Sequence, residues 1–254
     1  MSMKGFIDEA YQGKARSKHL ETRRGDIVFG LEDLAERVGV KPSRQDVEAL
    51  APDDPSLFAR LIASDPGGKY GMIWGILSSI AAERSAEPLR LPRRNYIGLE
   101  LRGGVIVLDQ AGEHVGEKMS GGRIFVRSNA GDYLGQEMAG GGIVAGSCGD
   151  YAFRKMHAGW GVVLEGAGKF LGIGNCGGRI AVRGDCGERA GWLMRGGSLR
   201  ISGDAGDYLG LLMSGGEIRV SGRAGKRAGW RMKGGKISAK AFGPEAAPSV
   251  MELE

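Results

Sequence analysis

Between Ala111 and Lys240 the chain repeats one phrase about every 19 residues, and this short period constrains the fold more than any other feature. The phrase is roughly Ala-Gly-x-x-Leu-Gly-x-x-Met-x-Gly-Gly-x-Ile-x-Val. Its copies begin at Ala111, Ala130, Cys148, Ala167, Cys186, Ala205 and Ala224, with a partial copy at Asn95. A unit this short cannot bury its apolar face alone, so successive units must stack on one another.

Each unit combines a short alternating strand with a pair of glycines. In Ile124-Phe125-Val126 the first and third residues share one face, and the second points outward. A glycine pair such as Gly121-Gly122 precedes each strand and allows a sharp turn. Glycines this frequent exclude a helix, because each costs about 1 kcal/mol relative to alanine. The sequence therefore predicts a right-handed parallel β-helix over residues 94–240, with about seven to eight coils.

Every full unit but one carries a methionine at the same phase of the repeat. These residues are Met119, Met138, Met156, Met194, Met213 and Met232. A copper site would need soft ligands that converge on one ion, whereas stacked coils spread these side chains along the axis. We therefore predict a structural methionine column in the core. Asn175 interrupts the column and must find hydrogen bonds if it is buried.

Composition and cysteine usage favour a soluble cytoplasmic protein. The 254 residues are 42% hydrophobic, with no apolar run long enough to cross a membrane and no signal-peptide pattern. Cys148 and Cys186 lie two coils apart, about 9–10 Å, which is too far for a disulfide. Cys176 occupies a different phase. All three are expected to be reduced thiols and not a metal cluster.

The net charge of +5 is concentrated near the end of the repeats. Between Arg219 and Lys240 no residue is acidic, and the basic ones are Arg219, Arg223, Lys226, Arg227, Arg231, Lys233, Lys236 and Lys240. This stretch can be a solvated cap on the last coil or a docking surface for an acidic partner. Nucleic acid is disfavoured because no aromatic stacking platform accompanies the charge.

Helical periodicity replaces the repeat in residues 1–90. Leu31, Leu34, Ala35 and Val38 share one helix face. A capping box at Ser43, the pair Asp54-Pro55 and an apolar run from Met72 to Ile80 mark three further helices. These residues predict a small helical region that packs over the first coil and protects its edge. Residues 241–254 are expected to form a C-terminal tail.

Residues 31–50 also permit a regulatory interpretation. Leu31 to Val40 resembles the opening of a helix-turn-helix, as in a DNA-binding regulator. The continuation weakens this alternative, because the next apolar anchor, Val47, comes about two residues late. Asp46 and Glu48 would also carry negative charge toward phosphate, which is unfavourable.

No catalytic, cofactor-binding or metal-binding residues are predicted on this chain. The segment from Gly172 to Gly177 matches G-x-G-x-x-G, but its glycines belong to the repeat and no helix is expected after it. His114 is expected at a tolerant outward position, because other units carry Tyr133, Phe170, Arg189, Tyr208 and Arg227 there. Neither His114 nor His157 has a nucleophile or metal-ligand pattern beside it.

The most irregular unit, from Cys148 to Gly166, is the candidate partner interface. Phe153 replaces a repeat glycine there, and large aromatic residues on a scaffold of small ones are typical association anchors. Basic neighbours could attract an acidic partner. The candidate interface residues are Phe153, Arg154, Lys155, His157 and Trp160, together with Arg227 and Lys233 of the basic terminal coil. Alternatively, Phe153 and Trp160 fill the core of a distorted coil.

The repeat phrase resembles the GXGXG repeats of two related groups of proteins. It is seen in full from Ala111 to Gly122 and again from Ala205 to Gly216. One group is the GXGXG-repeat subunit of formylmethanofuran dehydrogenase, with its counterpart in the bacterial formyltransferase/hydrolase complex. The other is the C-terminal domain of the large subunit of glutamate synthase. The resemblance covers residues 94–240.

The resemblance implies a non-catalytic scaffold subunit in a hetero-oligomeric enzyme complex. In these families the chemistry belongs to partner subunits or domains, which carry molybdenum or tungsten pterin, zinc, or flavin and iron–sulfur groups. A free-standing chain of this length favours the formylmethanofuran dehydrogenase group and one-carbon transfer. A glutamate synthase component and a binding module for another metabolic enzyme stay open as alternatives.

Overall fold

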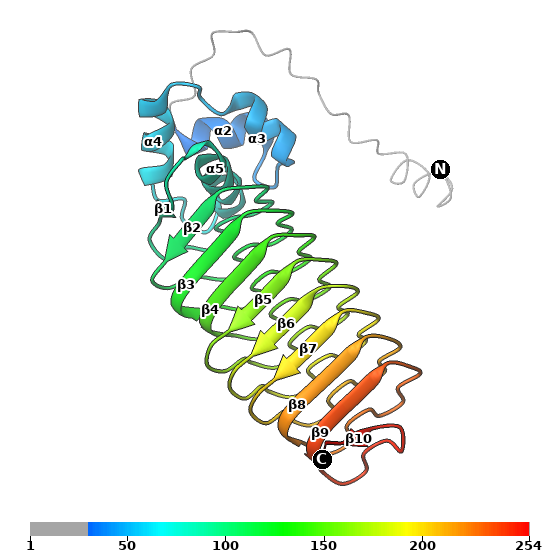
Figure 1. Cartoon of the computed structure of the whole chain (residues 1–254). Coiled ribbons are helices and arrows are strands. Elements are labelled where there is room, and N and C mark those ends of the chain that lie inside the picture. Colours follow the sequence, from blue (N-terminus) through cyan, green and yellow to red (C-terminus); the bar gives the residue numbers. More distant parts are fainter. Residues whose placement is uncertain (1–29, 254) are drawn as a thin grey trace, which may run out of the picture.

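The computed structural model describes residues 30–253 as a right-handed parallel β-helix with four helices at one end (Figure 1). Its single sheet has ten parallel strands in sequence order, and each pairs only with its neighbours along the chain. The strands are β1 (Leu89–Arg90), β2 (Val105–Leu108), β3 (Arg123–Ala130), β4 (Gly142–Cys148), β5 (Trp160–Val163), β6 (Arg179–Val182), β7 (Ser198–Ile201), β8 (Glu217–Ala224), β9 (Lys236–Phe242) and β10 (Met251–Glu252). The predicted fold class is confirmed.

The register places equivalent repeat positions next to one another. Ile180 pairs with Leu199, which pairs in turn with Ile218, so their side chains form one buried column. A second ladder of isolated bridges runs from Cys148 to Ala224 on another side of the coil. Because every coil repeats the same inward residues, the core extends along the whole axis without a break.

The predicted methionine column lies in this core. Met119, Met138, Met156, Met194 and Met213 are fully buried, and Met232 of the last coil is partly exposed. Asn175 is also fully buried and finds the partners that burial demands. Its Nδ2 donates to the carbonyl of Gly178, and its Oδ1 accepts from the amides of Gly177 and Gly178.

Stacking leaves no room for side chains at some corners of the coil. A Cβ added at Gly121 would lie 2.0 Å from the carbonyl oxygen of Arg102 in the preceding coil. Gly122 has a φ of +70°, a conformation that other residues adopt only with strain. The repeated glycine pair is therefore required by close backbone approach and turn geometry together.

Phe153 lies in the core and not at the surface, which corrects its assignment as an exposed anchor. Phe153 replaces a turn glycine whose missing Cβ points inward: a Cβ added at the equivalent Gly191 would touch Ile218. The ring needs space, and Gly161 provides it by replacing the strand isoleucine. A Cβ added at Gly161 would lie 2.2 Å from Cζ of Phe153.

Four helices cover the first coil (Figure 1). They are α2 (Leu31–Val38), α3 (Arg44–Leu50), α4 (Pro55–Ala63) and α5 (Gly71–Arg84). Ser43 and Asp46 form the expected capping box at α3, and Asp54 caps α4, whose first residue is a proline. Residues 1–29 of the predicted helical region lie outside the described residues.

Helix α5 is buried on most sides and closes the open end of the solenoid. Ser79 Oγ donates to the carbonyl of Leu99 at 2.7 Å, and Ser78 Oγ accepts from the amide of Gly98 at 3.0 Å. Arg44 of α3, almost fully buried, donates to the carbonyl of Glu100 at 2.6 Å and forms a salt bridge with Glu83. The expectation that the helices pack over the first coil is confirmed.

The residues expected as a C-terminal tail continue the solenoid at its far end. Strand β9 runs to Phe242, and β10 pairs with it through Met251 and Glu252. Phe242 and Val250 pack against the core beyond the last repeat. Among residues 30–253, no helix is long and apolar enough to cross a membrane.

Candidate protein-docking surface

The outer face of the sheet is apolar over its first half. The outward residues of each strand alternate with the buried ones, and from β2 to β6 most of them are apolar. We call this set the apolar sheet face: Val105, Val107, Phe125, Val144, Trp160, Val162 and Ala181. Each is only partly buried. Contiguous exposed apolar surface on a protein typically marks a contact with another molecule.

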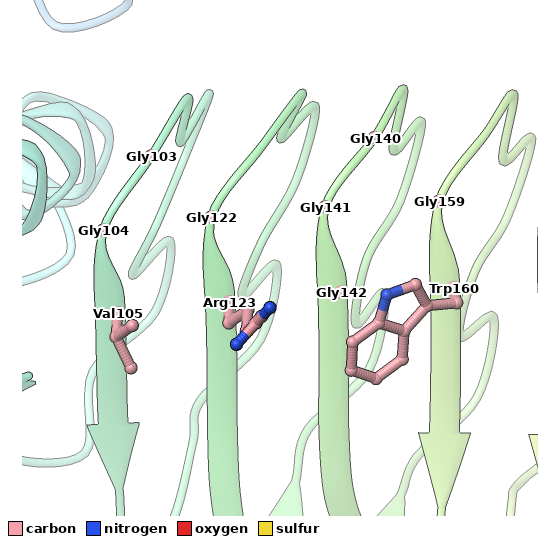
Figure 2. A pocket seen from close by; sticks show the side chains of 10 residues that line it. All are labelled: Gly103, Gly104, Val105, Gly122, Arg123, Gly140, Gly141, Gly142, Gly159 and Trp160. Carbon is pink, nitrogen blue, oxygen red and sulfur yellow. The ribbon is translucent and has the colours of Figure 1, made fainter.

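A groove of about 650 Å³ lies where β2 to β5 begin (Figure 2). Glycines of the paired-glycine turns form much of its wall, and Val105 and Arg123 complete it. Figure 2 shows the ring of Trp160 reaching from β5 across Gly142 of β4. A Cβ added at Gly142 would lie 2.1 Å from Cζ2 of Trp160, so only glycine leaves the indole this position.

A smaller hollow of about 250 Å³ continues the groove along β5 to β7. It is lined by Trp160, Val162 and Ala181 on the apolar side and by Arg179 and Arg200 on the other. Trp160 therefore belongs to both hollows and lies at the centre of the surface. Aromatic side chains with arginines around them are the residue types enriched at energetically important contacts.

Cations become the main outward residues from β6 onward. The exposed residues are Arg179, Arg183, Arg200, Arg219, Arg223, Lys236 and Lys240. No salt bridge involves any of their side chains within residues 30–253. The acidic residues on the same face, which include Asp204 and Glu217, are fewer than these basic residues. Excess unpaired positive charge favours an acidic partner and would speed its association.

The remaining predicted interface residues do not gather on this face. Arg154 donates to Gln136 Oε1 at 2.9 Å, and Lys155 Nζ lies 3.7 Å from Glu137; both bonds are at the turn that precedes Met156. His157 is exposed just after that turn. The structure thus joins Trp160 to the apolar sheet face and separates it from its basic neighbours in the sequence.

The two basic residues predicted in the terminal coil differ in environment. Arg227 donates to Glu245 at 2.8 Å and to the hydroxyl of Tyr208 at 2.8 Å, so its charge is largely engaged. Lys233 is exposed. Both lie several coils away from Trp160, at about 4.8 Å per coil.

A stacked column of rings runs along the outside of the solenoid at the position of His114. Adjacent rings of Tyr96, His114, Tyr133, Tyr151 and Phe170 have centroids 4.6 to 5.1 Å apart and are nearly parallel. Arg189 continues the column between Phe170 and Tyr208, at 5.4 and 5.6 Å from their centroids. This position is therefore a cross-coil contact and not the tolerant site expected from the sequence.

The role of His114 in this column is to stack between its neighbours. Its Nδ1 lies 2.7 Å from Glu117 Oε2, and its ring faces are covered by Tyr96 and Tyr133. Burial disfavours the charged form of Glu117, but the hydrogen bond with His114 holds the pKa of Glu117 below its ordinary value. With both faces covered and Nδ1 engaged, the ring is held as a stacking element.

Other sequence patterns considered for chemistry form no site in the described part of the chain. Gly172 to Gly177 is a turn in the fourth full coil, and strand β6 follows it instead of a helix. Residues 30–253 contain no group of three or more His, Cys, Asp or Glu side chains placed to hold a metal ion. Burial raises the pKa of Cys148 and of Cys186 to about 12, which keeps both thiols protonated and unreactive.

No protein-family model matches this chain, and no curated protein matches it significantly. The family resemblance carried by the repeat phrase therefore stays a prediction. The outward columns of the repeat, followed from strand to strand, would have revealed the apolar sheet face in the sequence, because Val107, Phe125, Val144 and Val162 occupy one phase.

Proposed function

We propose that this protein is a scaffold subunit without an active site of its own, in a multisubunit enzyme complex of the formylmethanofuran dehydrogenase or formyltransferase/hydrolase type. The apolar sheet face carries the proposal, because surface of this kind is typical of association. The repeat phrase supports the choice of complex through its resemblance to the GXGXG-repeat subunit of such complexes. The partner would be a catalytic subunit with an apolar patch and an acidic margin.

The proposed orientation follows from the two halves of the sheet. The apolar half, centred on Trp160, would bury its side chains against the partner and supply most of the affinity. The cationic half, from Arg179 to Lys240, would face acidic residues of the same partner and fix its direction along the axis. The long rigid sheet allows both contacts at once without a change of shape.

The chemistry would belong to the partners. A molybdenum or tungsten pterin, a zinc site, or flavin and iron–sulfur groups would all be carried by other subunits, and the substrate would be a one-carbon unit. The free thiols of Cys148, Cys176 and Cys186 support a reducing compartment, so we place the complex in the cytoplasm.

A glutamate synthase complex is the second candidate, because the same repeat phrase occurs in that group. The surface chemistry is compatible with either partner. The DNA-binding alternative is less well supported, because Arg44 and Val47 of α3 are buried against the rest of the chain. The exposed side chains of that helix include Asp46, which does not favour contact with phosphate.

Affinity purification of the tagged chain from its native host, followed by mass spectrometry and metal analysis, tests the proposal. We expect a pterin-dependent dehydrogenase or formyltransferase subunit in stoichiometric amounts, with molybdenum or tungsten. Recovery of amidotransferase and flavin subunits would instead support the glutamate synthase candidate. Purification of the chain without any metabolic enzyme subunit would contradict the scaffold proposal.

Surface variants locate the interface once the partner is known. Val144→Glu and Arg179→Glu each place an acidic group on the proposed docking face, and both should reduce co-purification strongly. Added salt should weaken the contact of the wild-type chain more than the contact of either variant. Lys155→Glu reverses charge at the turn expected from the sequence and should leave co-purification unchanged. The opposite pattern would place the interface at the turn that contains Arg154.

A further inference from the structure

A small polar hollow lies on the outer face of the sheet at β7 and β8. Its volume is about 200 Å³, and it is lined by Arg200, Ile201, Ser202, Arg219 and Ser221. Ile201 is buried in the core, so the other four residues supply the outward surface of the hollow, and all four are exposed. Most small-molecule sites have volumes of roughly 300–1,000 Å³, so this hollow suits one small chemical group.

The two arginines of the hollow stand directly beside each other, and we call them the arginine pair. Arg200 of β7 is the register partner of Arg219 of β8, which places their backbones one strand spacing apart, about 4.8 Å. Neither side chain makes a hydrogen bond or salt bridge in the described part of the chain. Like charges on adjacent strands repel each other, so this arrangement costs stability unless an anion lies between them.

The fold does not require arginine at this position of the repeat. In register with the arginine pair, the neighbouring strands carry Val162 in β5, Ala181 in β6 and Ser238 in β9. An apolar, a small and a polar side chain are therefore all accepted at the same point of the coil. Two adjacent arginines there indicate a ligand of opposite charge.

The side chains around the arginine pair are short and polar. Ser202 and Ser221 follow Arg200 and Arg219 by two residues in each strand, so on extended backbone they share the outer face with the arginines. Their hydroxyl groups line the hollow and can donate hydrogen bonds into it. The hollow thus offers donors of two kinds around one open space.

The charge surrounding the hollow is mainly positive. Arg179, Arg183 and Lys240 are exposed on the same face. Among the acidic residues, Glu217 stands in register between Ser198 and Lys236, and Asp204 accepts a hydrogen bond from the amide of Arg223 at 2.7 Å. The field of these groups favours an anion at the arginine pair.

The set of donors identifies the kind of anion. A guanidinium group presents a planar fork of N–H donors that matches carboxylate or phosphate oxygens. The donors of two such groups and two hydroxyls outnumber the lone pairs of a single carboxylate. A phosphate monoester has more acceptor oxygens and a charge of about −1.5 to −2 at pH 7, which balances two arginines. A phosphodiester carries a single charge and balances them less well.

We propose that the arginine pair and the hydroxyls of Ser202 and Ser221 bind a phosphate group, supplied either by inorganic phosphate or by a small phosphate monoester. The two guanidinium groups bind neighbouring phosphate oxygens, and the hydroxyls donate to the same group. An ester oxygen would face the solvent, because the hollow is open outward. This site goes beyond the proposed function and stands without it, since one chain forms the whole site.

NMR titration of the purified full chain with inorganic phosphate, at constant ionic strength, tests this proposal. We expect saturable shifts of the Nε–Hε signals of Arg200 and Arg219, with a dissociation constant of about 1 mM because the site is open to solvent. Glycerol phosphate should bind within about threefold of this value, since its ester oxygen points outward. Acetate and dimethyl phosphate, which carry one charge each, should bind at least about tenfold more weakly.

Variants separate a built site from a diffuse positive surface. Arg200→Ala and Arg219→Ala should each weaken phosphate binding about tenfold. Arg219→Lys keeps the charge but removes the fork, so it should lose most of the same affinity. The matched control Arg223→Ala removes one charge from the same strand outside the hollow and should change the affinity less than about twofold. Unfolding midpoints equal to that of the wild type would show that each variant is folded.

The absence of saturable shifts up to about 20 mM phosphate would overturn the proposal. Equal affinity for acetate or dimethyl phosphate would also overturn it, because the donor set would then not select a phosphate dianion. An equal loss in Arg223→Ala and Arg219→Ala would overturn it as well, since diffuse attraction would explain the binding. Binding of inorganic phosphate without glycerol phosphate would support the site and assign it to the free ion.

Discussion

Phe153 and Gly161 depart from the repeat in complementary ways, and this pair allows a direct test of how the core is packed. Phe153 stands where most coils have a turn glycine, and Gly161 stands between Ile143 and Ile180 in the strand register. A Cβ at Gly161 would lie 2.2 Å from Cζ of Phe153. One aromatic ring from the turn therefore occupies the space that a strand isoleucine fills in the neighbouring coils.

The two single substitutions should each destabilise the protein for opposite reasons. Phe153→Gly empties the site, which costs about 3–5 kcal/mol for a buried aromatic residue. Glycine relieves about 1 kcal/mol of strain, because Phe153 has a φ of +56°. The expected net loss is therefore about 2–4 kcal/mol. Gly161→Ile overfills the site, with a loss of about 1–3 kcal/mol or more.

The double variant recreates the regular unit and should lie within about 1 kcal/mol of the wild type. Denaturant unfolding followed by tryptophan fluorescence gives the three free energies. Ile180→Gly is a matched control, because it removes the equivalent strand isoleucine in the next coil, where no aromatic ring fills the space. It should cost about 2–5 kcal/mol. If the loss in the double variant equals the sum of the single losses, the ring and the missing side chain do not share one space, and the packing argument is refuted.

Three further outcomes follow from the columns and the thiols, and one from the absence of a predicted active site. Met213→Ala should cost about 2–5 kcal/mol in unfolding free energy, whereas Arg200→Ala on the outer face should change it by about 0.5 kcal/mol or less. Tyr133→Gly should be more stable than Tyr133→Ala by about 1 kcal/mol, because both lose the ring contacts but only glycine relieves the left-handed backbone. Alkylation at about pH 8 followed by mass spectrometry should label the exposed Cys176 and spare Cys148, whose pKa burial raises. Absorbance and metal analysis of the chain produced without partners should find no stoichiometric flavin, pterin or iron–sulfur group.

The fold could be predicted because its determinants are local and periodic. The glycine pair, the alternating strand and the methionine recur in most units, so the structure of one unit predicts that of nearly all the others. The helical region was also accessible, since Ser43 and Asp54 cap helices through contacts within three residues. Signals of this range are visible along the chain without knowledge of the tertiary structure.

The surfaces were harder to predict because their information runs across the coils. The burial of Phe153 depends on Gly161, eight residues later, and neither substitution alone reveals the compensation. The stacking of His114 depends on Tyr96 and Tyr133 in the coils on either side. Such contacts become visible only when equivalent positions are compared from one unit to the next.

Inward and outward columns of this solenoid obey different physical constraints. The inward columns keep one character along most of the axis, because each coil must pack against the next. The outward columns change character partway: the sheet face passes from Val144 and Val162 to Arg200 and Arg219, and the turn passes from Lys155 to Leu193. At the turn, part of this change is absorbed by contacts within the chain, as where Trp192 lies against Phe170, whereas the apolar residues of the sheet face, such as Val144 and Val162, remain partly exposed. The apolar stretch of the sheet face is therefore the part of the surface that supports the proposed docking of a partner.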